Sequence, residues 1–149
     1  MTLAKWGTYR NFNEQEAWGD SSRMSHELLL ALDDFRDYVR TPVLVLCGTQ
    51  KEHTRHSKHP KGEAVDVTFL ERGETPLFEL FLSAFRFPFT GVGVYPHWTH
   101  NGKTVGGLHV ELTLGETPRK MWLGVRPNKD EPQVYLPVSR KNLRLYGVV

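Results

Sequence analysis

Apolar residues recur every three or four positions in two segments of the chain, residues 21–40 (SSRMSHELLLALDDFRDYVR) and residues 74–85 (ETPLFELFLSAF). This spacing places the apolar side chains on one face of an α-helix, so both segments are predicted to be amphipathic helices. Ser21 or Ser22 is suited to cap the first helix, and Thr75 is suited to cap the second. Both helices are therefore expected to pack an apolar face against a core.

A period of two, which is typical of a strand with one buried face, marks residues 63–70 (EAVDVTFL) and 106–114 (GGLHVELTL). The polar face carries Asp66 in the first strand, and His109 and Glu111 in the second. Further short strands are predicted at residues 43–47, 90–96, 133–138 and 143–149. Asp66 can lie in an otherwise apolar strand because only one face of that strand has to be apolar.

The order of these elements predicts an α+β fold, in which helices pack on a mainly antiparallel sheet. The 149 residues, 39% hydrophobic and 24% charged, suit a single domain that spans residues 1–149. The formal net charge of +2 is too small to indicate an anionic partner by itself. The basic segment at residues 51–61 has no interleaved aromatic residues, so no nucleic-acid partner is expected.

The N-terminal residues lack the apolar core of a signal peptide, and no apolar run approaches the ~20 residues needed to cross a bilayer. We therefore expect a protein that is made in the cytoplasm without a signal peptide and does not associate with membranes. The one cysteine, Cys47, excludes an internal disulfide. Because it lies in the apolar run PVLVLCG, it is expected to be a buried, unreactive thiol.

Three residues that can bind metal are placed where a fold can bring them together. Asp66 and His109 lie on the polar faces of their strands, and His59 precedes Asp66 by seven residues. If the two strands are neighbours, the three side chains can meet at one point. Two imidazoles and a carboxylate with an open fourth position are typical of a catalytic zinc site. The alternative is that Asp66 faces solvent and the histidines are incidental.

The segment SKHPKGEAVD, residues 57–66, fits the S-x-H-x-x-G-x-A-x-D signature of the zinc D-alanyl-D-alanine carboxypeptidases. GVGVYP at residues 91–96 and LHVEL at residues 108–112 resemble the second block of the small endolysin-like and peptidoglycan-endopeptidase branch of that family. The resemblance covers about residues 12–122 and implies the fold shared with the Hedgehog signalling domain. It also implies that Zn²⁺ is bound by His59, Asp66 and His109.

The sequence departs from this family at the expected catalytic acid. Many relatives carry a glutamate three residues before the last histidine, where this chain has Gly106. Glu111, two residues after His109 on the same strand face, is then the candidate catalytic residue, a general base that passes a proton to the leaving amine. Two other roles stay open for Glu111: it orients His109, or it is a solvated strand residue.

A second departure lies at CGTQ, residues 47–50, where relatives have Ser-Gly-Tyr-Arg. Gln50 replaces an arginine that relatives use to bind substrate, and a neutral amide supplies no charge to a transition state. Lys51 or Arg55 could supply a cation in its place. By the resemblance, Tyr95 with Gln50 or Arg55 is expected to orient the substrate.

The resemblance implies a zinc metallopeptidase that cuts peptide bonds of bacterial peptidoglycan. The absence of a signal peptide suits a bacteriophage enzyme that reaches the cell wall after lysis or as part of a virion, by analogy with other members of the family. The alternative is a weak or inactive family member, a metal-stabilised structural or binding protein such as a phage virion component. The expected partners are peptidoglycan peptides and, for the virion forms, other virion proteins.

Overall fold

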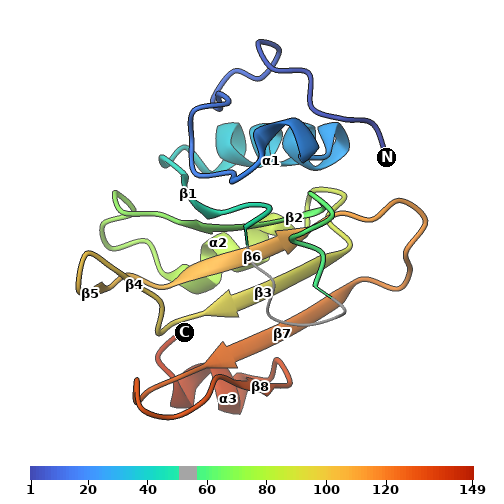
Figure 1. Cartoon of the computed structure of the whole chain (residues 1–149). Coiled ribbons are helices and arrows are strands. Elements are labelled where there is room, and N and C mark those ends of the chain that lie inside the picture. Colours follow the sequence, from blue (N-terminus) through green and yellow to red (C-terminus); the bar gives the residue numbers. More distant parts are fainter. Residues whose placement is uncertain (51–56) are drawn as a thin grey trace.

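A six-stranded sheet forms the centre of the molecule in the computed structural model, which describes residues 1–50 and 57–149 (Figure 1). In spatial order its strands are β1 (Leu44–Cys47), β2 (Ala64–Thr68), β6 (Gly107–Glu111), β3 (Gly91–Tyr95), β7 (Lys120–Val125) and β8 (Val134–Leu136). Neighbouring strands are antiparallel except β3 and β7, which run parallel. A separate hairpin consists of β4 (Thr99–His100) and β5 (Lys103–Thr104). The predicted α+β class with a mainly antiparallel sheet is confirmed.

Three α-helices accompany the sheet: α1 (His26–Val39), α2 (Leu77–Ala84) and α3 (Arg140–Leu145). Figure 1 shows α1 beyond the β1 edge, α2 behind the sheet and α3 beside β8 at the opposite edge. α2 packs on β3 and also contacts α1, so these two helices cover the same core. In the part of the chain that the structure describes, no helix is long and apolar enough to cross a membrane.

The predicted helix caps are wrong at both helices. Ser25 is the N-cap of α1, because its hydroxyl accepts the Leu28 N–H at 3.2 Å. Ser21 belongs to a short 3-10 helix, η1 (Ser21–Arg23). The apolar pattern predicted too early a start for this helix because Met24, which is not helical, is nevertheless fully buried in the core. At α2 the N-cap position is Pro76, without a side-chain cap.

The apolar faces of β2, β3 and β6 meet the helices in one core. Their alternating side chains are at most 1% exposed: Val65, Val67, Val92, Val94, Leu108 and Val110. The same cluster contains residues from the inner faces of α1 and α2, among them Leu28, Leu32, Phe35 and Phe81. The period-two interpretation of these strands is therefore confirmed.

The C-terminal third differs most from the sequence-based expectation. Residues 143–149 were predicted to form a strand, but α3 covers Arg140–Leu145, capped by the Ser139 hydroxyl, which accepts the Asn142 N–H. Strand β7 was not predicted. Its first residues are exposed and its last three are buried, so it has no alternation for a pattern to detect.

Candidate metal centre

Asp66 and His109 face each other across two neighbouring strands. They are direct partners in the β2–β6 register, and opposite residues of an antiparallel pair project from the same face. Asp66 Oδ1 lies 3.0 Å from His109 Nδ1. Both side chains are buried, with residue exposures of 1% and 9%. The expected meeting of these two residues is confirmed.

His59 reaches the same carboxylate from the turn that precedes β2. His59 Nε2 lies 3.3 Å from Asp66 Oδ1. The Ser57 hydroxyl accepts the His59 N–H, and the Gly62 N–H closes the turn on the His59 carbonyl at 2.9 Å. Gly62 has a φ of +73°, and a β-carbon there would collide with the Arg23 carbonyl. The turn therefore needs glycine for its conformation and for close packing.

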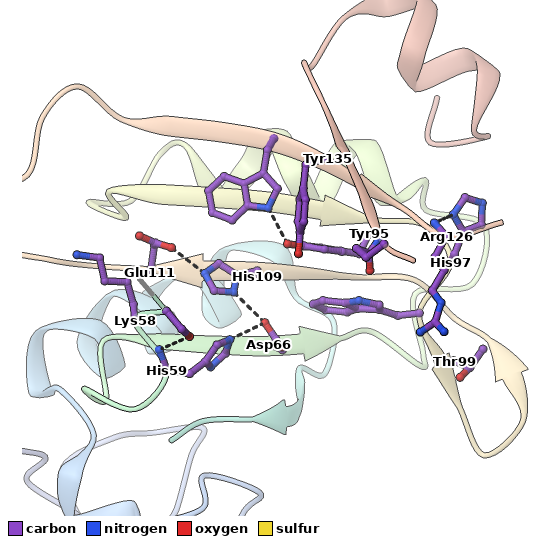
Figure 2. Close-up of a pocket in the computed structure, with 14 residues that line it drawn as sticks. Lys58, His59, Asp66, Tyr95, His97, Thr99, His109, Glu111, Arg126 and Tyr135 are labelled. Atoms are coloured by element: carbon purple, nitrogen blue, oxygen red, sulfur yellow. Dashed lines mark hydrogen bonds and ion pairs between the residues drawn. The ribbon is translucent and has the colours of Figure 1, made fainter. Parts of the chain in front are cut away.

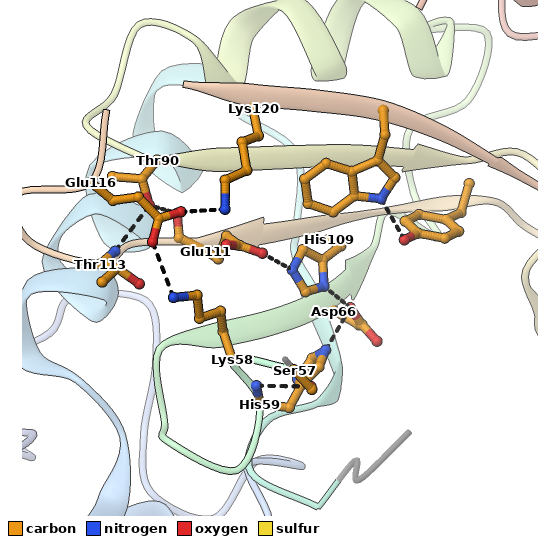
Figure 3. Close-up of polar contacts among 12 residues, drawn as sticks. Ser57, Lys58, His59, Asp66, Thr90, His109, Glu111, Thr113, Glu116 and Lys120 are labelled. Atoms are coloured by element: carbon orange, nitrogen blue, oxygen red, sulfur yellow. Dashed lines mark hydrogen bonds and ion pairs between the residues drawn. The ribbon is translucent and has the colours of Figure 1, made fainter. Parts of the chain in front are cut away.

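His59 and His109 each form with Asp66 a pair of donors whose chemistry and spacing suit neighbouring ligands of a metal ion. Two ligands of a tetrahedral ion with bonds of 2.0–2.1 Å are about 3.3 Å apart. The distances from Asp66 Oδ1 to His59 Nε2 and to His109 Nδ1, 3.3 and 3.0 Å, are close to that spacing. The other ring nitrogens are occupied: His59 Nδ1 is 2.7 Å from the Gly48 carbonyl oxygen, and His109 Nε2 is 2.8 Å from Glu111 Oε1. These outer bonds fix the ring orientations, as is typical of metal-binding histidines; Figure 3 shows the bond from His109 to Glu111.

The electrostatics of the metal-free site depend on Asp66. Burial by itself lowers the pKa of His59 and of His109. Hydrogen bonds and charge interactions with Asp66, helped by Cys47 at His59 and by Glu111 at His109, outweigh burial and raise each pKa to about 9. Burial raises the pKa of Asp66, whereas hydrogen bonds from His109 and His59 lower it more, well below its usual range. The carboxylate thus stays ionised and attracts positive charge, either protons on the imidazoles or a metal ion.

Cys47 is a donor that the sequence did not place at the site. In the pairing of β1 with β2, Cys47 lies opposite Asp66, and the register is irregular between Val45 and Cys47. Its sulfur, one ring nitrogen of His59 and one oxygen of Asp66 all lie within 4.8 Å of one another, and all three residues are buried. This group can hold a metal ion. The predicted burial of Cys47 is confirmed, but the register irregularity that turns it toward Asp66 leaves no signal in the sequence.

Glu111 completes a row of polar groups along the sheet. Its Oε1 accepts the hydrogen bond from His109 Nε2, and the residue is 7% exposed. The alternative of a solvated strand residue is therefore wrong, whereas the orienting contact with His109 is present. Gly91, opposite Glu111 on β3, gives this side chain its space, because a β-carbon there would press on Glu111 Cγ.

His59, Asp66, His109 and Glu111 line a cavity of about 730 Å³ together with four aromatic side chains (Figure 2). Tyr95 and Trp98 stack with ring centroids 4.3 Å apart, and Trp122 Nε1 donates to the Tyr95 hydroxyl at 2.6 Å. Tyr135 lines the same cavity from β8. A β-carbon at Gly93 would collide with the Trp122 indole, so this glycine makes room for an aromatic ring rather than for a metal. Sequence analysis named Tyr95 but missed the other three rings.

Among the described residues, two cations line the cavity, Lys58 and Arg126, and both have partners in the protein. Lys58 Nζ is 3.0 Å from Glu116 Oε2. Arg126 donates to the backbone carbonyl oxygens of Glu131 and Lys129. Both cations border the space available to a substrate, and sequence analysis had assigned neither a role in the site.

Gln50, which was also expected to bind substrate, lies away from the cavity. Gln50 is not among the residues that line the cavity: its Oε1 accepts the Gly48 N–H at 2.7 Å and its Nε2 donates to the Ala17 carbonyl at 2.9 Å. The amide thus binds backbone on both sides and holds the turn after β1. Arg55, like Lys51, lies outside the described residues.

Comparisons of the chain with models of known protein families, with curated proteins and with solved structures gave no match. The class of protein is therefore defined by the fold and the site alone. It is an α+β protein in which buried imidazole, carboxylate and thiol donors can hold a metal ion, and the imidazole and carboxylate groups line a cavity.

Proposed function

We propose that this protein is a zinc-dependent peptidase that cuts peptide bonds of bacterial peptidoglycan. By this proposal it belongs to the D-alanyl-D-alanine carboxypeptidase-like family, in its small endolysin-like branch, and has the Hedgehog/D,D-peptidase fold. The observation that carries the proposal is the approach of His59 Nε2 and His109 Nδ1 to one oxygen of Asp66 at the cavity. The signature segment supplies two of these residues, and the neighbouring strand supplies the third.

His59, Asp66 and His109 would hold the ion. A zinc ion with three such ligands acts as a Lewis acid and makes water nucleophilic near neutral pH. The protein's part is to keep the donors in place. The Gly48 carbonyl holds the His59 ring, and Glu111 holds the His109 ring, so each histidine turns one defined nitrogen toward Asp66.

Glu111 has two compatible tasks at this site. Its carboxylate fixes His109, and it also lines the cavity in which a substrate would bind. A carboxylate at that place can take a proton from the attacking water and give it to the leaving amine. The positioning task needs only a hydrogen-bond acceptor, whereas the proton-transfer task needs an ionisable group, so two substitutions separate them.

Tyr95 is suited to bind a substrate oxygen. Its hydroxyl accepts the Trp122 N–H, and an indole can only donate, so the hydroxyl proton points elsewhere. Burial is the main cause of the raised pKa of Tyr95, which therefore stays protonated near neutral pH. A buried hydroxyl donor beside the candidate metal ligands can stabilise charge that develops on the oxygen of the scissile bond.

A second candidate function is favoured by Cys47 and Gln50. A thiol close to His59 and Asp66 offers a further donor, and a site with four protein ligands is typical of structural zinc. The amide at position 50 is bound to backbone and supplies no charge to the cavity. In this alternative the protein is a metal-stabilised structural or binding protein, for example a phage virion component. Under both proposals the place of action is the cell wall or the virion.

Digestion of purified muropeptides tests the proposed function. The full-length protein with zinc is expected to release new amino groups, and His59→Ala is expected to release none. Glu111→Ala should remove activity and weaken metal binding, whereas Glu111→Gln should retain the metal and lose activity. His100→Ala is the control, because His100 lies on β4 and does not line the cavity. If zinc binds stoichiometrically but the wild type is as inert as His59→Ala, the peptidase proposal is wrong.

A further inference from the structure

Two further donors lie near the pair formed by His59 and Asp66, and each could complete a set of three. In the first set the third donor is His109, whose Nδ1 lies 3.0 Å from Asp66 Oδ1. In the second it is Cys47, whose sulfur lies within 4.8 Å of both shared donors. β1 and β6 flank β2 on opposite sides, so the sulfur and the His109 ring reach Asp66 from opposite neighbouring strands. The Asp66 carboxylate therefore has a candidate metal donor on each neighbouring strand.

The backbone holds Cys47 in place. The carbonyl of the next residue, Gly48, accepts the hydrogen bond from His59 Nδ1 at 2.7 Å, which links the end of β1 to the histidine ring. The Thr49 N–H donates to the Trp18 carbonyl at 2.7 Å. A β-carbon at Gly48 would collide with the Trp18 backbone, so this turn is closely packed. Cys47 itself is 4% exposed. The sulfur is thus positioned by a fixed segment of chain.

We propose that Cys47 is a fourth protein ligand of the ion bound by His59, Asp66 and His109. On binding, the thiol loses its proton to solvent and a sulfur–metal bond of about 2.3 Å forms for zinc. A thiolate favours zinc and other ions with an affinity for sulfur over magnesium or calcium, which prefer oxygen donors. The site therefore selects a zinc-like ion.

A fourth ligand from the protein changes what the site can do. Catalytic zinc sites keep one position open for water or substrate, whereas structural sites fill all four positions with protein ligands. With Cys47 bound, the resting site is closed, and a substrate gains access to the ion only if the sulfur leaves or the ion accepts a fifth ligand. This inference rests on the metal binding of the proposed function but does not depend on peptidase activity.

Cobalt substitution tests the proposal on the full-length chain. Co²⁺ is added to metal-free, reduced protein, and absorption is recorded in the near ultraviolet, where thiolate-to-cobalt charge transfer appears, and in the visible, where the d–d bands report coordination. Cys47 is the only cysteine, so any charge-transfer band from the protein reports this residue. The wild type is expected to show the band. Cys47→Ser is expected to lose it while it keeps the d–d bands from the remaining ligands.

Two further measurements keep the result interpretable. Far-ultraviolet circular dichroism of metal-free Cys47→Ser should match the wild type, and zinc should slow the reaction of the wild-type thiol with a disulfide reagent. If cobalt binds one-to-one without the charge-transfer band, Cys47 is not a ligand and the inference is overturned, while the three-ligand site of the proposed function stands. If no cobalt binds to the wild type, the inference and the proposed metal site both fail.

Discussion

The two faces of strands β2, β6 and β3 differ in chemistry but not in burial. On one face, valine and leucine side chains meet α1 and α2; on the other lie Asp66, His109 and Glu111. All five positions of each strand are buried. Alternation of apolar and polar residues usually separates a buried face from a solvated one. Here it separates a face that stabilises the fold from a face whose polar groups must satisfy one another.

The energetic consequences of the two faces are opposite. Burying an aliphatic side chain stabilises the folded state by roughly 1.5–3 kcal/mol. Burying a charged group is unfavourable unless it is paired and hydrogen bonded, and such pairs are weak evidence for stability. The row from His59 through Asp66 and His109 to Glu111 is paired at every step. We infer that this row is kept for binding rather than for stability.

The largest effect is expected for Asp66→Asn, which removes the charge that both histidines approach. Loss of a group that only supports a metal ligand costs about 10–100-fold in affinity, so loss of this shared donor should exceed about 100-fold. Zinc titration by calorimetry measures it. Val67→Ala, the next residue on the opposite face of β2, is the control and should keep the affinity of the folded protein. Equal losses in both variants would remove the distinction between the faces.

Leu108→Ala tests the apolar face. Leu108 is 0% exposed, and truncation of a fully buried leucine lowers the free energy of unfolding by about 2–5 kcal/mol. Urea denaturation with a chelator present measures the change. Met121→Ala on β7, where the side chain is 57% exposed, should change stability by less than about 0.5 kcal/mol. A change in zinc affinity of folded Leu108→Ala would show that the two faces are not independent.

Two substitutions of Glu111 distinguish its positioning of His109 from the effect of its negative charge. Glu111→Ala removes the acceptor for His109 Nε2 and should weaken zinc binding by about 10–100-fold. Glu111→Gln retains an oxygen at the same place and should weaken it much less. Competition with a chromophoric chelator measures both affinities. If the alanine variant binds zinc as tightly as the wild type, Glu111 does not position His109.

The stability of the metal-free protein and that of the zinc-bound protein should depend differently on pH. In the metal-free protein the pKa values of His59 and His109 are raised from 6.5 to about 9. A pKa that is higher in the folded than in the unfolded state contributes stability below pH 6.5, and this contribution is lost as the pH rises through about 9. Zinc must displace these protons, so its stabilising effect should grow over the same range. Urea midpoints with chelator or zinc measure both trends, and parallel trends would contradict the assignment.

The smallest effect is expected at the edge of the cavity. Glu116 joins Lys58 and Lys120 in a partly exposed ion-pair group, at 3.0 and 2.6 Å (Figure 3). Such pairs contribute about 0–1 kcal/mol, so Glu116→Gln should lower stability by no more than that and leave zinc affinity unchanged. Thermal unfolding and zinc titration of the variant check the two parts. A large loss of affinity would place Lys58 among the groups that support the metal.

Sequence analysis was accurate where a regular hydrophobic pattern corresponds to one structural role, as in strands β2 and β6. Period-two alternation located β2 and β6 and their polar faces, and the signature segment identified His59 as a residue of the same site as Asp66. From the sequence, Asp66 and His109 could be expected to meet only if their two strands were neighbours. The structure shows that β2 and β6 are paired and that these residues lie opposite each other. The resemblance to a family of zinc peptidases named the same three residues, but it remains a proposal.

The missed features depend on contacts between distant segments. Cys47 reaches the site through an irregular register in β1, and Trp122 fills the space above Gly93 from a strand without alternation. Gln50 looked like a substrate contact because of its place in the segment, yet its amide is bound to backbone groups of Gly48 and Ala17. Local patterns carry no information on such packing, so these positions could not have been predicted from one sequence.

The metal stoichiometry of the polar face is the most direct test. Native mass spectrometry of the full-length protein with zinc, compared with His59→Ala and with Val67→Ala, counts the ions bound per chain. We expect one zinc ion in the wild type and in Val67→Ala, and none in His59→Ala at the same zinc concentration. A wild type without bound zinc, or equal occupancy in His59→Ala, would contradict the assignment of this face as a metal centre.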